Sequence, residues 1–296
     1  MNAELNDIIA QVPGWAGLGP QDLAVEQLEG LTNQNYSVTV NGERFVVRIS
    51  GKNTQYLGIQ RALESQVLSV VSQAGLGPQV VRFFPEGHLV KRYIEGRHWT
   101  AEEYRTPANL RRIVETVKRL HSLPAVRATF SPFRRVEAFA RQAQSFGVPF
   151  PEDWPTFVEK ARAIEAVQLD DASPWLRFCH NDLFWVNWLD DGSIKLLDWE
   201  FAGMGDIYFD LATLVYAYES VGPLPAELEE FLLECYLGEV HPEHRARLKG
   251  MEFMVQFFAA MWGMLQNGLQ RAGLVPVVSG FDYLEYAQAT FAAMRE

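Results

Sequence analysis

The dipeptide Asn41-Gly42 lies between two runs of residues that favour extended structure. Both residues tolerate a positive φ, and Asn-Gly between such runs is the strongest short-range signal for a β-hairpin. The apolar period then changes to that of a helix over 59–74, and Gly75 suits the position after a helix end. Strands are expected at 36–40, 43–49, 79–84 and 88–94. The order strand, strand, helix, strand, strand predicts a small mixed lobe over residues 1–95.

The chain changes character after Glu95-Gly96, and most later segments carry apolar residues at helical spacing. A helix is expected to end near Pro124, and others are expected at 133–147, 154–167, 207–220, 226–237, 244–271 and 281–295. Short strands are expected at 177–179 and 194–197. Residues 1–28 read as short pieces of helix broken by Pro and Gly. We therefore predict an α+β fold of two lobes, with a larger, mainly helical lobe over 96–296 and a hinge near 93–97.

Composition excludes several classes of protein. Apolar residues make up 48% and charged residues 21% of the 296 residues, which is ordinary for a folded chain and excludes wholesale disorder. The net charge of −11 argues against general nucleic-acid binding, since phosphate contacts need clustered Lys and Arg. Two cysteines make no disulfide framework, and there is no basic-then-apolar leader, so a reducing cytoplasm is expected. The longest run of apolar residues and glycine, 257–265, is too short for a membrane span.

The charge is distributed unevenly along the chain. Residues 179–220 hold eight acids and one base, whereas residues 80–135 hold twelve bases and five acids. The acidic segment is also rich in aromatic and aliphatic residues, so it is not a solvated tail. Acids embedded in apolar sequence are usually paired, or they hold a cation.

The acidic segment contains a set of side chains suited to phosphoryl transfer. Transfer from ATP to a hydroxyl needs an acceptor for the hydroxyl proton and a cation on the phosphates. Asp182 and Asn187 lie on a loop after the short strand at 177–179, and Asp198 follows the apolar run 194–197. A base, an amide and a carboxylate at these places could meet at one cleft, and a carboxylate with an amide oxygen suits Mg²⁺.

These residues resemble a known family. His-Asn-Asp with Asn187, followed by an apolar strand ending in Asp198, resembles the catalytic and metal loops of the protein-kinase-like superfamily. HNDL, LLDWEFAGMGDIYFDLA and residues 30–49 resemble the choline/ethanolamine kinase and aminoglycoside phosphotransferase group, in particular its bacterial choline kinase-like branch. The resemblance covers roughly 25–220. It implies a bilobal protein-kinase-like fold, with a nucleotide-binding lobe at 1–95 and catalytic and acceptor-binding sites in the lobe at 96–296.

The resemblance also assigns roles to single residues. Asp182 matches the catalytic base, and Asn187 and Asp198 match the Mg²⁺ ligands. Arg48 matches the strand cation that touches the ATP phosphates, with Glu64 as its partner. No G-x-G-x-x-G loop is present, so the phosphates would be held by backbone N–H groups and by Thr32, Asn33 and Asn35.

Further residues have more than one reading. His180 matches a residue that orients the loop, and Asp210 is expected to anchor that loop rather than react. Glu200 could bind metal or substrate, or act as a cap. Trp262 and Glu219 are candidates for holding a cationic acceptor, because aromatic faces and acids attract ammonium groups. His121 is expected to be a core histidine. The sequence departs from the choline kinase pattern of two Trp one turn apart, because Ala259 lies one turn before Trp262.

The expected activity is an ATP- and Mg²⁺-dependent kinase acting on a hydroxyl of a small cationic molecule. Choline or ethanolamine is the first candidate acceptor, thiamine the second and an aminoglycoside the third. The alternative is a pseudokinase or nucleotide-binding module without phosphotransfer, which the absent glycine loop favours. A metal-dependent phosphatase would need more His or Asp ligands than the sequence places there, since the chain has six histidines and no H-x-D-type pair or second metal cluster near these acids. The chain could be a monomer or a homodimer, and nothing in the sequence separates ATP from GTP.

Overall fold

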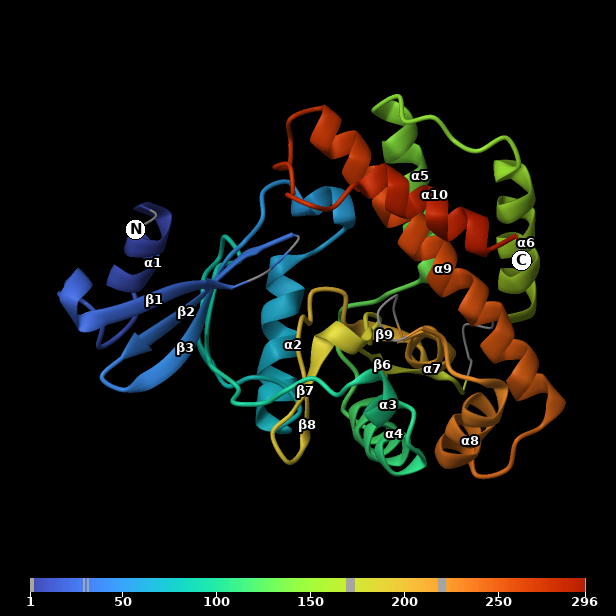
Figure 1. The fold of residues 1–296 in the computed structure, drawn as a ribbon, viewed down its shortest axis with the longest axis horizontal. Helices are drawn as coiled ribbons and strands as arrows, with labels where there is room; N and C mark the ends of the chain where they lie inside the picture. The colour runs from blue at the N-terminus through green and yellow to red at the C-terminus, as the bar shows by residue number, and fades with distance from the viewer. Residues whose placement is uncertain (1–2, 29, 31, 169–173, 218–221, 296) are drawn as a thin grey trace.

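The N-terminal part of the structure is a five-stranded antiparallel sheet in the order β1-β2-β3-β5-β4 (Figure 1). The structure is a computed structural model, and it describes residues 3–28, 30, 32–168, 174–217 and 222–295. The strands are β1 (Leu23–Leu28), β2 (Gln34–Val40), β3 (Glu43–Ile49), β4 (Val80–Phe83) and β5 (Leu89–Arg92). Asn41 and Gly42 have φ values of 51° and 82°, so the predicted hairpin turn is confirmed.

The strand β1 contradicts the prediction of helical pieces over 1–28. Among the described residues 3–28, only α1 (Ala3–Ala10) and a short 3-10 turn at Pro20–Asp22 are helical. Residues 23–28 instead pair in antiparallel register with 35–40 of β2. The hydrogen bonds of that pairing decide the conformation, and local sequence does not report them.

The two faces of the sheet have different partners. On the outer face, α1 packs through Leu5, Ile8 and Ile9 against a buried cluster that includes Val47 and Val90. The opposite face turns toward α2 (Arg61–Gln73) and the helical part of the chain (Figure 1). Side chains alternate along a strand, so neighbours of the buried residues point into the space between sheet and helices.

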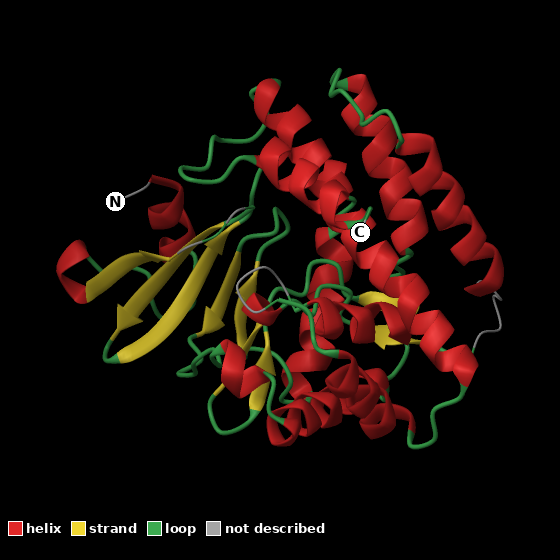
Figure 2. Ribbon diagram, turned by 45° about the vertical axis from the view of Figure 1, so that its right-hand side comes forward, coloured by secondary structure: helices red, strands yellow, loops and turns green. Residues whose placement is uncertain are grey.

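The rest of the chain is mostly helical, as predicted (Figure 2). Its helices are α3 (Ala101–Tyr104), α4 (Pro107–His121), α5 (Pro132–Ser145), α6 (Trp154–Gln168), α7 (Ile207–Tyr216), α8 (Ala226–Leu237), α9 (Pro242–Arg271) and α10 (Tyr283–Ala293). Two small antiparallel sheets pair β6 (Leu176–Cys179) with β9 (Gly203–Asp206) and β7 (Trp188–Asp190) with β8 (Ile194–Leu196). The long helix α9 packs against α5, α7 and α10. The predicted α+β class is therefore confirmed, whereas the lobe boundary between 95 and 96 stays a prediction.

The sheet part and the helical part are also joined away from the segment that follows β5. The guanidinium of Arg135 on α5 donates to the carbonyls of Leu57 and Gly58 at 3.0 and 2.9 Å. The side chain of Asn53 donates to the carbonyl of Leu274 at 2.7 Å. These contacts hold residues 53–58 against the helices. No helix among the described residues is long and apolar enough to cross a membrane.

Candidate active site

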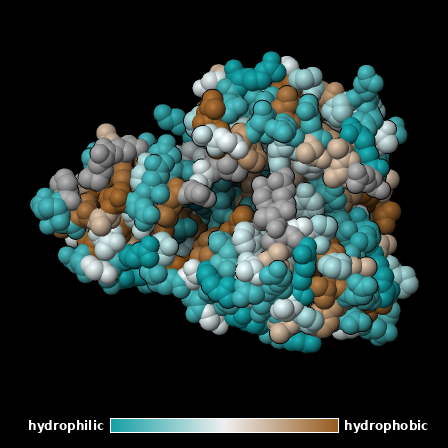
Figure 3. All heavy atoms as spheres, in the orientation of Figure 1, coloured by the Kyte–Doolittle hydropathy of each residue, from teal (hydrophilic) through white to brown (hydrophobic). Residues whose placement is uncertain are grey.

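A cleft of about 810 Å³ lies between the sheet and the helical part. Its lining comes from β2, β3 and β5, from the segments around β7 and β8, and from α9 and α10. Figure 3, in the orientation of Figure 1, shows the small sheet part projecting from the larger helical part, with a hollow between the two. Nearly all of the predicted site residues line this one cleft, although their positions span most of the chain.

The loop after β6 is fixed by Asp210 on α7. The carboxylate of Asp210 accepts from the backbone N–H groups of His180 and Asn181, at 2.8 and 2.7 Å. It also contacts His121 Nε2 at 3.0 Å, and His121 Nδ1 lies 2.7 Å from the hydroxyl of Tyr236. Asp210 is fully buried, so these contacts satisfy a charge that would otherwise be costly there. The geometry is that of an anchor for the loop.

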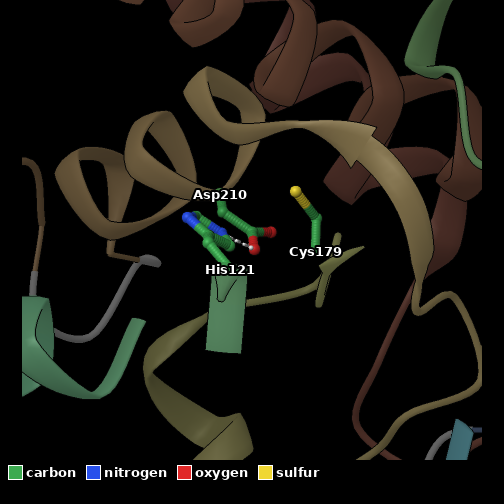
Figure 4. A group of neighbouring side chains, drawn as sticks. All are labelled: His121, Cys179 and Asp210. Carbon is green, nitrogen blue, oxygen red and sulfur yellow. Dashed lines mark hydrogen bonds and ion pairs between the residues drawn. The ribbon is translucent and has the colours of Figure 1, made fainter. Parts of the chain in front are cut away.

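Figure 4 shows His121 and Asp210 facing one another, with Cys179 beside them. Three such ligand atoms lying within 4.8 Å could in principle hold a metal ion. The Asp210 oxygens, however, already accept the hydrogen bonds just described. The thiol of Cys179 donates to the carbonyl of Gly205 at 3.3 Å, and burial raises its pKa, which keeps the thiol protonated. His121, Cys179 and Asp210 therefore form a buried structural cluster that supports the loop after β6.

His180 joins the loop to the strand that precedes Asp198. Its Nε2 lies 2.7 Å from the carbonyl of Leu197, and its ring packs against Trp199 with centroids 4.5 Å apart. Burial lowers the pKa of His180 to about 4, so the ring is neutral near pH 7 and Nε2 carries the proton that Leu197 accepts. A neutral, buried ring in this contact orients the loop and does not act as a base.

Asp182, Asn187 and Asp198 come together at the mouth of the helical part. The amide nitrogen of Asn187 donates to the carboxylate of Asp182 at 2.7 Å and to its carbonyl at 2.9 Å. The backbone N–H of Leu197 donates to the carbonyl of Asn187 at 2.7 Å. Asp198 follows with a φ of 55°, an uncommon value for a residue with a side chain, which re-aims the chain at the end of β8.

The carboxylates of this group repel one another. Burial raises the pKa of Asp182, and the nearby charges of Asp198 and Glu200 raise it further. Burial also raises the pKa of Asp198, against the opposing effect of the Arg48 charge. Because Asn187 uses its nitrogen on Asp182, its amide oxygen remains for a cation, together with the Asp198 carboxylate. This set of oxygen donors fits Mg²⁺, which prefers carboxylate and amide oxygens.

A buried cluster of alternating charges lies on the sheet side of the cleft. Arg48 on β3 donates to both oxygens of Glu64 on α2, at 2.6 and 3.1 Å, and to the carbonyl of Gly87 at 2.9 Å. Arg61 on α2 donates to Glu64 at 2.6 Å and to Glu200 at 2.8 Å. The predicted partners Arg48 and Glu64 are thus in contact, and Glu200 is held by Arg61 from the sheet part.

The residues predicted to hold the phosphates in the absence of a glycine-rich loop are Thr32, Asn33 and Asn35, which lie before and at the start of β2. Asn33 donates to Glu200 at 3.3 Å and accepts from the backbone N–H of Gly51 at 3.0 Å. Thr32, Asn33 and Asn35 all line the cleft.

Aromatic side chains of α9 and α10 line the other end of the cleft. The Trp262 ring lies 5.4 Å from the ring of Tyr283 and 6.0 Å from that of Tyr286, centroid to centroid. Trp262 and Tyr286 line the cleft, as does Ala259 one turn before Trp262. The remaining predicted acceptor residue, Glu219, lies outside the described residues.

Sequence reasoning missed two residues that line the cleft, Lys91 and Tyr286, and it missed Arg61, which binds the cleft residue Glu200. Arg61 is the first residue of α2, and a basic residue there gives no signal of a buried role. Tyr286 reaches Trp262 only because α10 packs on α9. Lys91 would have been found by aligning the alternation of β5 with that of β3, since both strands turn one face to the cleft.

The antiparallel sheet, the loop that carries Asp182 and Asn187, and Asp198 after a short strand define the class of protein-kinase-like folds. The choline/ethanolamine kinase family model matches residues 25–221, and the chain belongs to that family.

Individual relatives agree with this assignment at low identity. Protein LicA of Haemophilus influenzae is 27% identical over 78% of this chain and 68% of its own length. A choline/ethanolamine kinase of Rattus norvegicus is 25% identical over 94% of this chain and 81% of its own. Among solved structures, a choline/ethanolamine kinase family protein from Mesorhizobium loti is 28% identical, with a TM-score of 0.77 over 99% of this chain and 92% of its own. LicA in complex with AMP is 21% identical and shares the fold, with a TM-score of 0.73 over 99% and 100%.

Proposed function

We propose that this protein is a kinase that transfers the γ-phosphate of ATP to the hydroxyl of a small cationic alcohol, with choline or ethanolamine as the first candidates. The observation that carries the proposal is the contact of Asn187 with Asp182 beside Asp198, at a cleft whose far end is lined by Trp262 and Tyr286. The first three residues supply a base and cation ligands. The aromatic rings supply faces that attract an ammonium group.

In this proposal the acceptor hydroxyl attacks the γ-phosphorus while Asp182 takes its proton, and the bond to the β–γ bridging oxygen breaks to release ADP. The hydrogen bond from Asn187 favours the deprotonated form of Asp182 and fixes its orientation. Asp198 and the Asn187 amide oxygen would hold Mg²⁺, which neutralises charge on the phosphates. Asp210 and His180 keep the loop rigid, so that Asp182 stays aligned during transfer.

The aromatic end of the cleft supports a cationic acceptor. Trp262 presents its ring beside Tyr286, and both line the cleft that Asp182 also lines. A quaternary ammonium is recognised by ring faces because it cannot donate hydrogen bonds. Ala259 contributes only a methyl group, so the acceptor site is wider than one with two tryptophans on this helix. A wider site keeps thiamine and aminoglycosides as further acceptors to test.

The test is Mg²⁺-dependent formation of ADP by the purified protein, with choline, ethanolamine, thiamine and kanamycin added in turn. We expect stimulation by one acceptor and its loss in Asp182→Asn, which keeps the size of the side chain. Trp262→Ala should raise the KM for a cationic acceptor about tenfold or more and leave the KM for ATP near its original value, in line with the energy of a desolvated cation–π contact. ATP binding without stimulation by any acceptor would favour the pseudokinase alternative.

A further inference from the structure

Lys91 lies on the cleft face of the sheet. In the register of β3 with β5, Lys91 is opposite Val46, and Leu89 is opposite Arg48. All four line the cleft, whereas Val90, between Leu89 and Lys91, is buried in the cluster on the outer face. The side chain of Lys91 therefore enters the same space as Arg48.

The two arginines on this side are already occupied. Arg48 is bound to Glu64 and to a backbone carbonyl, and its side chain is only 5% exposed. Arg61 bridges Glu64 and Glu200 at 2.6 and 2.8 Å. Each of these two carboxylates is thus matched by a guanidinium. Both arginines are thus engaged with buried carboxylates, and drawing either one toward a ligand would give up part of these contacts.

Lys91 differs from the two arginines in having no bonded partner among the described residues. In the part of the chain that the structure describes, its ammonium forms no ion pair and no hydrogen bond. Burial lowers the pKa of Lys91, the charge of Arg48 lowers it further, and the carboxylate of Asp198 opposes both. Lys91 is half-buried and lines the cleft, so its ammonium is open to a ligand, and no contact within the described part of the fold accounts for its position.

We propose that Lys91, a cation of the cleft with no bonded partner among the described residues, binds a phosphate oxygen of the nucleotide, while Arg48 and Arg61 position Glu64 and Glu200. The inference rests on the proposed function in one respect, that the bound molecule is a nucleoside triphosphate. An ammonium is a compact donor of three hydrogen bonds that suits a phosphate oxygen. The two functions expected of Arg48 are thus shared between two residues: Arg48 binds Glu64 on α2, and Lys91 binds the phosphate.

The experiment compares Lys91→Met and Lys91→Arg with the wild type by calorimetric titration with ADP and with adenosine, each in Mg²⁺. Methionine keeps the length of the stem and removes the charge. We expect Lys91→Met to weaken ADP binding about 10- to 100-fold, the loss typical of a hydrogen bond between charged groups. Adenosine, which has no phosphate, should bind as before, and Lys91→Arg should recover part of the ADP affinity.

The matched control is Lys118→Met, since Lys118 is exposed on α4 and donates only to the carbonyl of Cys235. It should leave ADP binding unchanged. Thermal unfolding separates ligand binding from folding, because removing a charge that is bonded to no described residue should leave the unfolding midpoint of Lys91→Met unchanged or higher while its affinity for ADP falls. A residue with a merely structural role would lower the midpoint instead.

Other results would overturn the inference. Unchanged ADP affinity in Lys91→Met, or an equal loss for ADP and adenosine, would remove Lys91 as a phosphate ligand. Parallel titrations with GDP and guanosine test the base: a loss restricted to the guanine compounds would place the ammonium on a purine carbonyl. Absence of any acceptor-dependent turnover, with ADP binding intact, would reject the proposed acceptor reaction. The role of Lys91 would then still be decided by the ADP and adenosine titrations.

Discussion

The buried pair of Arg48 and Glu64 gives the sharpest test of the energetics of the site. Their side chains are 5% and 1% exposed and share hydrogen bonds at 2.6 and 3.1 Å. Removing one partner of such a pair costs about 3–5 kcal/mol, because the other charge stays buried. The two single variants should differ. In Arg48→Met, Glu64 keeps Arg61 at 2.6 Å, whereas in Glu64→Met the nearest acid to Arg48 is Glu200 at 4.0 Å.

We therefore expect Glu64→Met to lower the free energy of unfolding by about 4–5 kcal/mol and Arg48→Met by about 3 kcal/mol. The double variant leaves Arg61 paired with Glu200 at 2.8 Å, so its loss should be at least ~2 kcal/mol smaller than the sum of the single losses. The measurement is urea denaturation of the ligand-free protein, with the slope checked for each variant.

The control is the same cycle on Arg44 and Glu95, an exposed pair at 3.0 Å whose side chains are 37% and 69% accessible. Its coupling should be about 0–1 kcal/mol, as for other exposed ion pairs. Losses at the buried pair that simply add, or a larger loss for Arg48→Met than for Glu64→Met, would refute the reasoning. Either result would mean that Arg61 does not support Glu64 as its geometry indicates.

Three further predictions concern the frame of the site. Asp210→Ala removes an acceptor of two backbone N–H groups. We expect the free energy of unfolding to fall by about 3 kcal/mol and kcat to fall by at least ~100-fold, while a titration shows that ADP binding is retained. Burial raises the pKa of Asp206 to about 6, above its ordinary ~3.9, so folding favours the neutral form and stability should fall as pH rises from about 4 to 6. Asp206→Asn should remove that loss, so its free energy of unfolding, measured in thermal scans, should exceed that of the wild type by up to ~3 kcal/mol at pH 7 and match it at pH 4. Gly58 has a φ of 70°, and a Cβ there would overlap Arg135 Nη1. Gly58→Ala should therefore lower the free energy of unfolding, measured in urea, by about 2–3 kcal/mol. The control is Gly75→Ala, at a similar φ but with open space, which should lower it by about 1 kcal/mol.

Local signals predicted most elements of the fold. The turn at Asn41-Gly42 needed residues that accept a positive φ, and helices such as α8, at 226–237 as expected, follow from apolar spacing. The strand β1 was missed because its residues also suit a helix, and only the partner strand β2 decides between the two. Whether a short apolar segment pairs is a property of the whole sheet, which single-sequence patterns do not contain.

The chemistry of the site was predictable where it depends on spacing within one segment. Asp182, Asn187 and Asp198 lie within seventeen positions, on a loop and at a strand end whose types could be assigned. Arg61 and Lys91 carry no comparable signal. Their roles depend on which carboxylates already have partners, and that is decided by contacts between parts of the chain far apart in sequence.

The division of charge between the two sides of the cleft explains why the site suits a phosphate ligand with a cation. On the sheet side, Glu64 and Glu200 are matched by two arginines, which leaves the charge of Lys91 in excess. On the helical side, Asp182 and Asp198 stand without an arginine or lysine bonded to them among the described residues. Their mutual repulsion adds to the raised pKa of Asp182, and a divalent cation there would relieve it. A triphosphate bound with such a cation carries both signs of charge. Its phosphates would face the positive charge of Lys91, and its cation would face Asp182 and Asp198. The repulsion between these carboxylates before binding would then be replaced by attraction across the cleft.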